Sequence, residues 1–371
     1  MKGNPPYNKK KIVFIRTASS IGGAEITTKT VSEKLSKYFQ LYNYQYPYGL
    51  KTLYTKQIKG KTLLEPGGGI KDYIKFHLLY LIYRSEYIKL ANKITKENID
   101  TVIIESFSDK IILTKIIHKI SPRIKILWWE HGPMTRTKWL RYSPHLKYLY
   151  SKNLNYVNKI IVISKATQDD LSRMNVPIQK TRLIYPITEI ENPSKQKTTE
   201  NKKFTIGFTS RIEKEKGIYE LLQATKILQK TPINFIIAGK GRESNKVQLY
   251  INNNKLQKTV HFVGFQKDIS HILQKVDAVI LPSDHEGLGL TLIEALKMGI
   301  PIIGTNTGGI PEILKNGYNC ILIEKDPKDI SDKIYNLYIN KSLYKKLQAN
   351  TIKSIKNFDS KNIIQKWKSI L

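Results

Sequence analysis

Short apolar runs of strand length alternate with helix-length segments along the first half of the chain. A loop, Ser19–Gly23, follows the first run, and a helix is predicted to begin near Ala24. Ser164, directly after the last run, is a residue type that caps helix N-termini. Buried strands that alternate with helices predict a doubly wound parallel sheet. The predicted strands are Lys11–Ala18, Thr101–Glu105, Ile124–Glu130 and Lys159–Ile163.

The same alternation begins again after a polar stretch, Asn192–Lys202, whose only apolar side chain is Pro193. This predicts an α/β protein with two Rossmann-like domains that face a central cleft. The expected domains are 1–192, a linker at 193–203, 204–355, and a C-terminal helix, 356–371, that packs back on the first domain. The predicted strands of the second half are Phe204–Thr209, Asn234–Ala238, Val260–Val263, Ala278–Leu281, Pro301–Gly304 and Cys320–Ile323.

Glycines mark the carboxyl ends of these later strands, at Gly239, Gly264, Gly287 and Gly304. Open α/β sheets bind ligands at that edge. From Pro327 onward the pattern predicts helices only. With 371 residues, the chain is long enough for two domains of this kind.

Two cations, Arg211 and Lys216, lie five residues apart in the turn after the first strand of the second half. A helix N-terminus is predicted beside them, and its free N–H groups also favour an anion. A diphosphate would suit this place. The alternative is a surface loop in which Glu213 and Glu215 neutralise the two cations.

A second glycine-containing loop, from Pro282 to Gly289, leads into an apolar helix. Its glycines, Gly287 and Gly289, would let backbone N–H groups approach a phosphate closely. Glu286 lies in the loop and Glu294 eight residues further on, among apolar neighbours. A buried carboxylate needs hydrogen-bonding partners, and the two hydroxyls of a ribose would serve.

These motifs resemble the large group 1 (family 4) of retaining glycosyltransferases, which have the GT-B fold. The resemblance rests on the Arg211/Lys216 pair, on Glu286 and Glu294 at their spacing, and on Gly299–Pro301 and Thr307–Glu312 after them. It is dense from Phe204 to Leu322 and thinner before. It implies transfer of a hexose or N-acetylhexosamine from a nucleotide-diphosphate sugar to a hydroxyl of a glycan or lipid-linked acceptor, in bacterial envelope or capsular polysaccharide synthesis.

The resemblance also implies a role for each matching residue. Arg211 and Lys216 would bind the donor diphosphate, Glu286 the transferred sugar, and Glu294 the ribose. The N–H groups of Gly287, Leu288 and Gly289 would bind phosphate. Gly22 and Gly23 match a loop of the first domain that reaches the phosphate and the acceptor. His131, at the end of a predicted strand, matches a histidine beside the transferred sugar, although a lone histidine is more often structural. The expected catalytic residues are therefore His131, Glu286, Arg211 and Lys216.

The sequence departs from the family pattern at one position, and it lacks one motif that metal-dependent transferases have. The family commonly has glycine where Cys320 stands, which puts that turn in doubt. No Asp-x-Asp motif lies at a strand end, so we expect neither a metal nor another cofactor. The positive charges would take over the role of the metal.

Basic residues outnumber acidic ones by 62 to 30, and the net charge is +32. Such an excess favours a polyanionic partner: nucleic acid, an anionic membrane face or a phosphorylated substrate. No nucleic-acid-binding module is recognisable, so we expect no nucleic acid. The single cysteine excludes a disulfide framework, and Cys320 lies in an apolar run where burial is expected. No apolar run is long enough for a membrane span. We therefore expect a cytoplasmic protein that docks on the inner face of the membrane.

The first half carries two candidate surfaces for membrane or acceptor. Aromatics at Tyr73, Phe76, Tyr80, Tyr83 and Tyr87 share one face of a predicted helix. This face either packs on its own sheet, which is the commoner outcome, or meets lipid. A loop without acidic residues, Thr135–Pro144, combines Trp139 with Arg136 and Arg141 and would suit anionic headgroups or a lipid pyrophosphate. Two alternative functions stay open: a GT-B sugar-nucleotide epimerase, and a basic nucleic-acid-binding protein.

Overall fold

The structure of the chain, a computed structural model, describes residues 9–16, 22–44, 56–58, 84–134, 144–188, 190 and 203–371. The chain divides into two compact units. Unit 1 comprises Met1–Ile187 together with Lys361–Leu371, and unit 2 comprises Thr188–Ser360. The predicted linker, 193–203, lies outside the described residues except for Lys203. The loop residues 135–143 and four of the five aromatics, Tyr73 to Tyr83, lie outside them as well.

Unit 1 contains a parallel sheet of seven described strands in the order β3-β2-β1-β4-β5-β6-β7. The order reverses between β1 and β4, which pair in parallel through Ile12–Thr101 and Ile15–Ile104. In a doubly wound sheet, ligands bind at the carboxyl ends of the strands beside such a reversal. The strands are β1 (Lys11–Ile15), β2 (Gln40–Tyr44), β3 (Lys56–Ile58), β4 (Thr101–Ile104), β5 (Lys125–Glu130), β6 (Lys159–Val162) and β7 (Thr181–Leu183).

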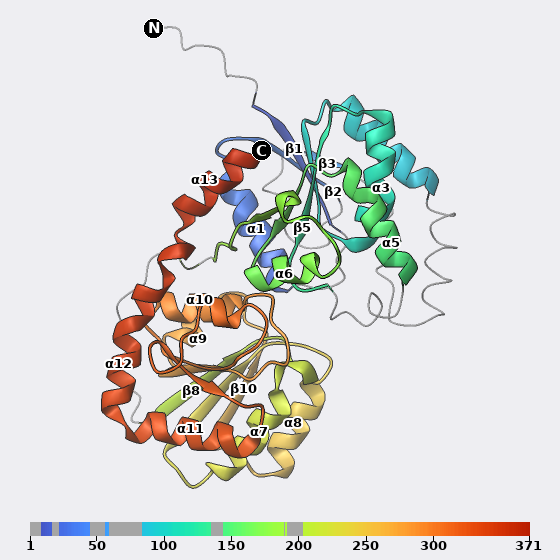
Figure 1. Cartoon of the computed structure of the whole chain (residues 1–371). Coiled ribbons are helices and arrows are strands. Elements are labelled where there is room, and N and C mark those ends of the chain that lie inside the picture. Colours follow the sequence, from blue (N-terminus) through green and yellow to red (C-terminus); the bar gives the residue numbers. More distant parts are fainter. Residues whose placement is uncertain are drawn as a thin grey trace, which may run out of the picture. The chain divides into compact units, whose positions relative to one another are not determined.

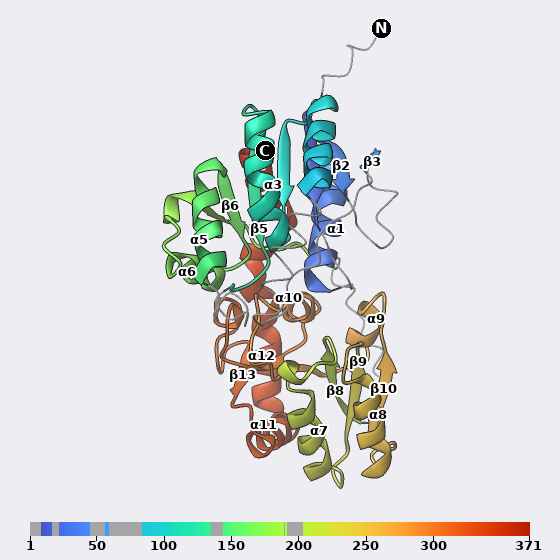
Figure 2. The same ribbon diagram turned by 90° about the vertical axis from the view of Figure 1, so that its right-hand side faces the viewer.

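Helices cover both faces of this sheet, which is why its strands are apolar on both sides. Helices α3 and α5 lie side by side on one face, and α1 and α13 lie on the other (Figures 1 and 2). On the α13 face, the fully buried Trp367 contacts Trp129 of β5, with 4.7 Å between ring centroids. These helices are α1 (Gly23–Leu35), α3 (Phe107–Ile120), α5 (Pro144–Asn153), α6 (Lys165–Ser172) and α13 (Ser360–Ile370), and residues 84–96 are also helical.

Unit 2 contains a parallel sheet of six described strands in the order β10-β9-β8-β11-β12-β13. Here the reversal lies between β8 and β11. The strands are β8 (Phe204–Thr209), β9 (Ile233–Ala238), β10 (Val260–Gly264), β11 (Ala278–Leu281), β12 (Ile302–Thr305) and β13 (Cys320–Ile323).

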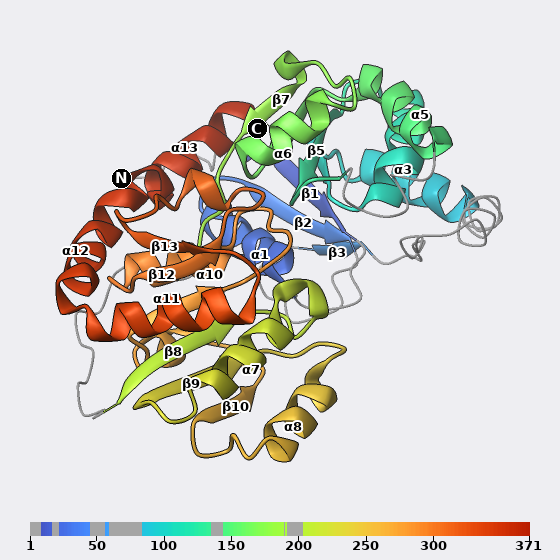
Figure 3. The same ribbon diagram turned by 60° about the horizontal axis from the view of Figure 1, so that its bottom comes forward.

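The helices of unit 2 also lie on both faces of their sheet. Helices α7, α8 and α11 pack on one face, where their apolar residues join those of the strands in one core (Figures 1 and 3). Helices α9 and α10 lie on the other face (Figure 1). Their bounds are α7 (Ile218–Ile227), α8 (Ser244–Asn253), α9 (Ser270–Leu273), α10 (Leu290–Lys297), α11 (Pro327–Ile339) and α12 (Lys341–Thr351).

The structure confirms the α/β class and the predicted strands, several to within a residue. It also confirms the helical tail, and Ser164, whose hydroxyl accepts a hydrogen bond from the Thr167 N–H. Cys320 is buried as expected, and burial raises the pKa of its thiol to about 12. Tyr87 packs in the core, where its hydroxyl donates to Asp109 at 2.7 Å, as the core interpretation of the aromatic face expects.

Three strands were missed in the sequence: β2, β3 and β7. Polar residues interrupt the apolar ones in β2 and β7, so neither forms a continuous apolar run. These segments form strands because they pair with neighbouring strands at or near the edges of the sheet, not because their own sequence favours a strand. In the described parts of the chain, no helix has the length and apolar character that crossing a membrane requires.

Candidate active site

Two loops at the strand ends of unit 2 are held together through their backbones. The first follows β8 and contains a short 3-10 turn, Lys214–Lys216, that ends at Gly217. Gly217 has a φ of +72°, and a Cβ there would lie 2.0 Å from the carbonyl oxygen of Pro282. The Asp284 N–H donates to the Glu215 carbonyl at 2.8 Å. Only glycine fits at this contact, so the loop after β8 and the loop after β11 form one rigid edge.

The backbone of Glu286 is fixed in the same way by the turn after β12. A Cβ at Gly308 would lie 1.9 Å from the Glu286 carbonyl oxygen, and the φ of Gly308 is +55°. The N–H of the next glycine, Gly309, donates to that oxygen at 3.2 Å. The Thr307–Glu312 turn therefore positions Glu286 by direct backbone contact.

The structure brings Lys216 and Glu286 together. Lys216 Nζ lies 2.6 Å from Glu286 Oε1, and it also donates to the His285 carbonyl at 3.2 Å. The Ser283 hydroxyl donates to the same carboxylate oxygen at 3.0 Å. Both side chains are nearly buried, with 10% and 12% of their surfaces exposed. An ammonium group has three N–H donors, so these two contacts occupy two of them and leave one for a ligand.

Arg211 lies at the same strand end as Lys216 and is exposed. Among the described residues, no carboxylate is paired with its guanidinium. Glu213 points elsewhere: it lies 3.4 Å from Arg242 Nε and accepts from the Arg242 N–H at 3.3 Å. Glu213 is therefore bound to Arg242 rather than to either predicted cation. The edge carries one exposed cation, Arg211, and one nearly buried cation, Lys216, that is paired with Glu286.

The remaining predicted residues of unit 2 lie around the start of α10. Gly289 precedes the first helical residue and has a φ of +82°. Leu288 is buried, so it contributes its backbone to this edge rather than its side chain. Glu294 is 6% exposed on α10. The Thr291 hydroxyl donates to the carbonyl of Thr209, the last residue of β8, at 3.0 Å, and this bond ties the helix to the edge.

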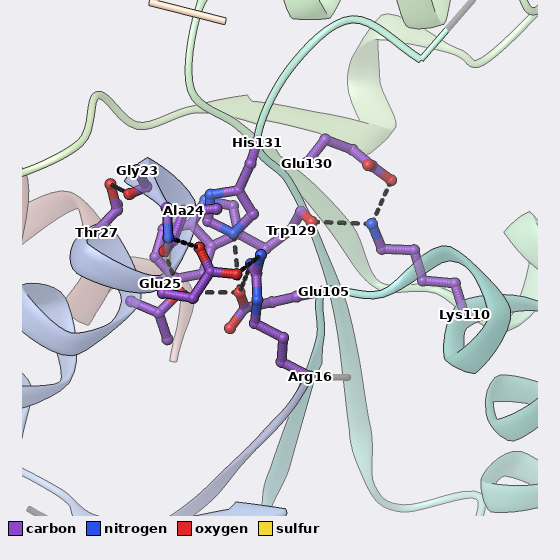
Figure 4. Close-up of polar contacts among 12 residues, drawn as sticks. Arg16, Gly23, Ala24, Glu25, Thr27, Glu105, Lys110, Trp129, Glu130 and His131 are labelled. Carbon is purple, nitrogen blue, oxygen red and sulfur yellow. Dashed lines mark hydrogen bonds and ion pairs between the residues drawn. The ribbon is translucent and has the colours of Figure 1, made fainter. Parts of the chain in front are cut away.

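Unit 1 holds His131 in a network of charged side chains at the ends of β1, β4 and β5 (Figure 4). His131 Nε2 lies 2.9 Å from Glu105 Oε2. Arg16 donates to the same oxygen at 2.8 Å and to Glu25 Oε1 at 2.6 Å. The Glu105 side chain is fully buried. One buried carboxylate therefore connects three strand ends.

The predicted glycines, Gly22 and Gly23, lie at the start of α1 beside this network. The Gly22 N–H donates to Glu25 Oε2 at 2.7 Å, so this donor is already used within the chain. Gly23 is the first residue of α1. N–H groups in the first turn of a helix have no partner inside the helix, which leaves that of Gly23 available to a ligand.

The network shifts the pKa of Glu105 and that of His131. Burial alone would raise the pKa of Glu105, but the hydrogen bond from His131 and the charge of Arg16 outweigh it, and the pKa is lowered to about 2. Burial lowers the pKa of His131, and although the Glu105 carboxylate opposes this, Arg16 and Lys110 reinforce it. At neutral pH, His131 is therefore neutral and Glu105 is ionised.

Arg16, Glu25 and Glu105 were missed as site residues in the sequence. Glu105 carried the clearest signal, since it ends the predicted strand Thr101–Glu105 at the ligand-binding edge. Arg16 gave a weaker signal, because it lies inside the first predicted strand, Lys11–Ala18, whereas the observed strand ends at Ile15. Their pairing depends on the strand order, which places β1 between β2 and β4 and cannot be read from local pattern.

Two doubly wound parallel sheets, each with its candidate residues at the strand ends, are the architecture of the GT-B fold. A family model described as "Glycosyl transferases group 1" matches residues 189–354, and one described as "Glycosyltransferase Family 4" matches residues 21–192. The chain belongs to the group 1 glycosyltransferases.

Individual relatives agree with this assignment. The chain is 25% identical to N-acetyl-alpha-D-glucosaminyl L-malate synthase of Bacillus anthracis, over 76% of the chain and 77% of the relative. It is 27% identical to the capsular polysaccharide biosynthesis glycosyltransferase CapM of Staphylococcus aureus, over 62% of the chain and 58% of the relative. Its fold is similar to that of HepE from Anabaena in complex with UDP and glucose, with a TM-score of 0.78, 18% identity, and 97% and 98% of the two chains covered.

Proposed function

We propose that this glycosyltransferase moves a hexose or an N-acetylhexosamine from a nucleotide-diphosphate sugar to a hydroxyl of a glycan or lipid-linked acceptor, with retention of configuration. UDP-N-acetylglucosamine and UDP-glucose are the first donors to test. The names of the Bacillus anthracis relative and of the Anabaena complex support this choice. The name of CapM supports a place in envelope or capsular polysaccharide synthesis.

The Lys216–Glu286 pair is the observation that carries the proposal. It joins a cation suited to the diphosphate to a carboxylate suited to the hydroxyls of the transferred sugar. The two groups are 2.6 Å apart, so a ligand with an anionic group next to a hydroxyl-bearing ring could contact both. A nucleotide sugar has these two parts side by side. Exposed Arg211 would supply the second charge on the diphosphate.

The other residues take supporting roles in this proposal. Glu294 would accept hydrogen bonds from the ribose hydroxyls, and Gly287, Leu288 and Gly289 would offer backbone N–H groups to the phosphates. On the unit 1 side, His131 and the N–H of Gly23 would contact the transferred sugar and the phosphate. Gly22 would act by shaping the turn, because its own N–H is bound to Glu25.

Charge neutralisation of the leaving group is the chemistry that these residues can supply. As the bond from the sugar to the diphosphate breaks, negative charge builds on the diphosphate, and Lys216 and Arg211 stabilise it. Front-face attack by the acceptor hydroxyl, with the leaving phosphate taking its proton, would retain configuration. We therefore assign no general base, and we propose that neither a metal nor another cofactor is needed. Rates that EDTA leaves unchanged would support the metal-independent part.

The test is a donor screen across UDP-, GDP- and ADP-sugars with glycan and lipid-linked acceptors. We expect one class of donor to bind, and free nucleoside diphosphate to be released only when an acceptor is present. The anomeric configuration of the product, read by NMR, tests retention. An epimerised nucleotide sugar formed without acceptor would favour the epimerase alternative, and tight salt-dependent binding to duplex DNA would favour the nucleic-acid-binding one.

Variants at the pair separate its two parts. Glu286→Ala should abolish transfer and leave nucleotide affinity nearly intact, because Lys216 keeps its charge. Lys216→Ala should lower kcat by about 10²- to 10³-fold. Arg211→Ala should weaken donor binding by about 10- to 100-fold.

The matched controls are Lys214→Ala and Arg242→Ala, which change two other exposed cations of the same unit. Full donor affinity in both Arg211→Ala and Lys216→Ala would contradict the phosphate assignment.

The lipid and membrane part of the proposal rests on charge alone. The net charge of +32 would attract the chain to anionic lipid. Sedimentation with vesicles of anionic against neutral lipid tests it, and equal binding to both would contradict it.

A further inference from the structure

The carboxylate of Glu105 accepts hydrogen bonds from three elements of unit 1 at one buried oxygen. Oε2 lies 2.8 Å from Arg16 Nη1 of the β1 end, 2.9 Å from the Thr28 hydroxyl of α1, and 2.9 Å from His131 Nε2 of the β5 end. We propose that Glu105 is a positioning residue that holds His131 in its Nε2–H form and so presents Nδ1 as a hydrogen-bond acceptor for a sugar hydroxyl. This inference rests on the proposed function.

The proton assignment follows from the chemistry of the carboxylate. An ionised carboxylate can only accept hydrogen bonds, so the imidazole nitrogen that faces it must carry the proton. In a neutral imidazole the other nitrogen is then an acceptor. Among the residues that the structure describes, none bonds to Nδ1. The His131 side chain keeps 14% of its surface exposed, so a ligand can reach it.

The ring of His131 is held on a second side by an aromatic neighbour. Trp129 lies against it with 4.5 Å between ring centroids and 37° between ring planes. The hydrogen bond to Glu105 fixes one edge of the imidazole, and this contact restricts rotation of the ring. A group held at two points presents its free nitrogen in one direction, which is what a contact to a single hydroxyl requires.

Burial, more than the charges around His131, lowers its pKa and keeps the ring neutral in this arrangement. Glu105 from the end of β4 favours the charged form of His131, whereas Arg16 from the end of β1 and Lys110 from α3 oppose it. Glu25 of α1 is paired with Arg16, and Glu130 of β5 with Lys110. Each of the two cations is thus already paired with a carboxylate, and burial decides the balance in favour of the neutral ring.

The same carboxylate also reaches the start of α1. Arg16 connects Glu105 to Glu25, and Glu25 Oε2 accepts the Gly22 N–H at 2.7 Å. Thr28, one turn further along α1, bonds to Glu105 directly. The Gly22–Glu25 hydrogen bond does not involve Glu105, so the first turn of α1 should persist in Glu105 variants, and their loss of kcat should arise at His131.

The direct test is the ¹⁵N spectrum of the histidine side chains in the intact wild-type chain at pH 7. The His131 signal is assigned as the one missing from His131→Gln. We expect the pattern of a neutral ring protonated at Nε2. A ring protonated at Nδ1, or a charged ring, would overturn the inference. Neither outcome depends on transferase activity, so this test is separate from that of the proposed function.

Two variants then test the cause. Glu105→Leu removes the acceptor and should produce a mixture of the two neutral forms, with kcat lower by about 10- to 100-fold and KM for the donor little changed. Glu105→Gln keeps an acceptor oxygen, so it should restore the Nε2–H form while lowering the pKa of His131, because the negative charge is lost. If Glu105→Leu does not fold, an unchanged His131 pKa in Glu105→Gln overturns the inference on its own.

A matched control and a double variant distinguish the positioning of His131 by Glu105 from a general loss of structure in unit 1. Glu130→Gln alters another buried carboxylate of the same unit, one that is bound to Lys110 and Tyr150, and should leave the proton position on His131 unchanged. Combining Glu105→Leu with His131→Gln should lower kcat no further than His131→Gln alone. Independent, multiplying effects would show that Glu105 acts through something other than His131.

Discussion

The two units position their candidate residues by different physical means. In unit 2, loops touch backbone to backbone, with glycines where no Cβ fits, and the charged side chains range from the exposed Arg211 to the nearly buried Lys216–Glu286 pair. In unit 1, a fully buried carboxylate accepts hydrogen bonds from side chains of separate elements, so its charge lies inside the protein. The first arrangement depends on shape. The second depends on every member of the network being present.

This difference predicts different responses to substitution. Replacing a glycine disrupts only the backbone contact at that position, whereas removing one partner from a buried ionic network leaves an uncompensated charge inside the protein. The two units also differ in continuity, because unit 2 is one segment of chain and unit 1 needs Lys361–Leu371 to complete it. Each contrast can be measured.

The largest effect is expected from Trp367→Ala, which tests continuity. Trp367 is fully buried against Trp129, and deleting a buried tryptophan side chain costs about 3–5 kcal/mol of unfolding free energy. Hydrogen exchange should show lower protection in β5 and unchanged protection in β11. Gln365→Ala, at an exposed position of the same helix, is the control. Equal loss in both sheets would mean that the two units do not unfold separately.

The next effect concerns pH and the buried charge of unit 1. Glu105 has a pKa of about 2 in the folded chain, against an ordinary value of 4.5. Its ionised form therefore stabilises the fold above pH 4.5, and this contribution is lost as the pH falls from 4.5 towards 2. It amounts to about 3 kcal/mol. Urea unfolding of wild type and Glu105→Gln at pH 7 and pH 3 should show the wild-type advantage shrinking at the lower pH. A constant difference between them would refute the assignment.

The smallest effect compares two glycines of unit 2 that both have positive φ. Gly317 has a φ of +69°, and no atom lies within 4 Å of the place that a Cβ would take, so Gly317→Ala should cost about 1–2 kcal/mol for backbone conformation alone. Gly308→Ala adds the clash with the Glu286 carbonyl and should cost about 1–3 kcal/mol more. Thermal unfolding measures the difference, and transfer activity should fall only in Gly308→Ala. Equal stability of the two variants would show that this contact yields easily.

The sequence predicted the candidate residues of unit 2 better than those of unit 1, for the same physical reason that distinguishes the two units. Apolar runs and glycines are local, so the strands of unit 2, the loop at Gly287 and the residues Lys216 and Glu286 were recognisable. Their direct pairing was not predicted, because it depends on how the loops after β8 and β11 meet. The Glu105 network was missed since its members are far apart in the chain: Arg16 and Glu105 are joined only by the strand order. Buried polar side chains of this kind show no periodicity that a pattern search could detect.

The place of α13 has a consequence for synthesis on the ribosome. Unit 2 is made as one segment, Thr188–Ser360, whereas the first part of unit 1 is complete long before its last helix exists. At an elongation rate of about 5–20 residues per second, the delay is on the order of ten to forty seconds. During that time the face of β5 that bears Trp129 has no α13 to cover it. The N-terminal sheet therefore reaches its final form last, and a nascent chain must keep that apolar face from aggregating until Trp367 has been made.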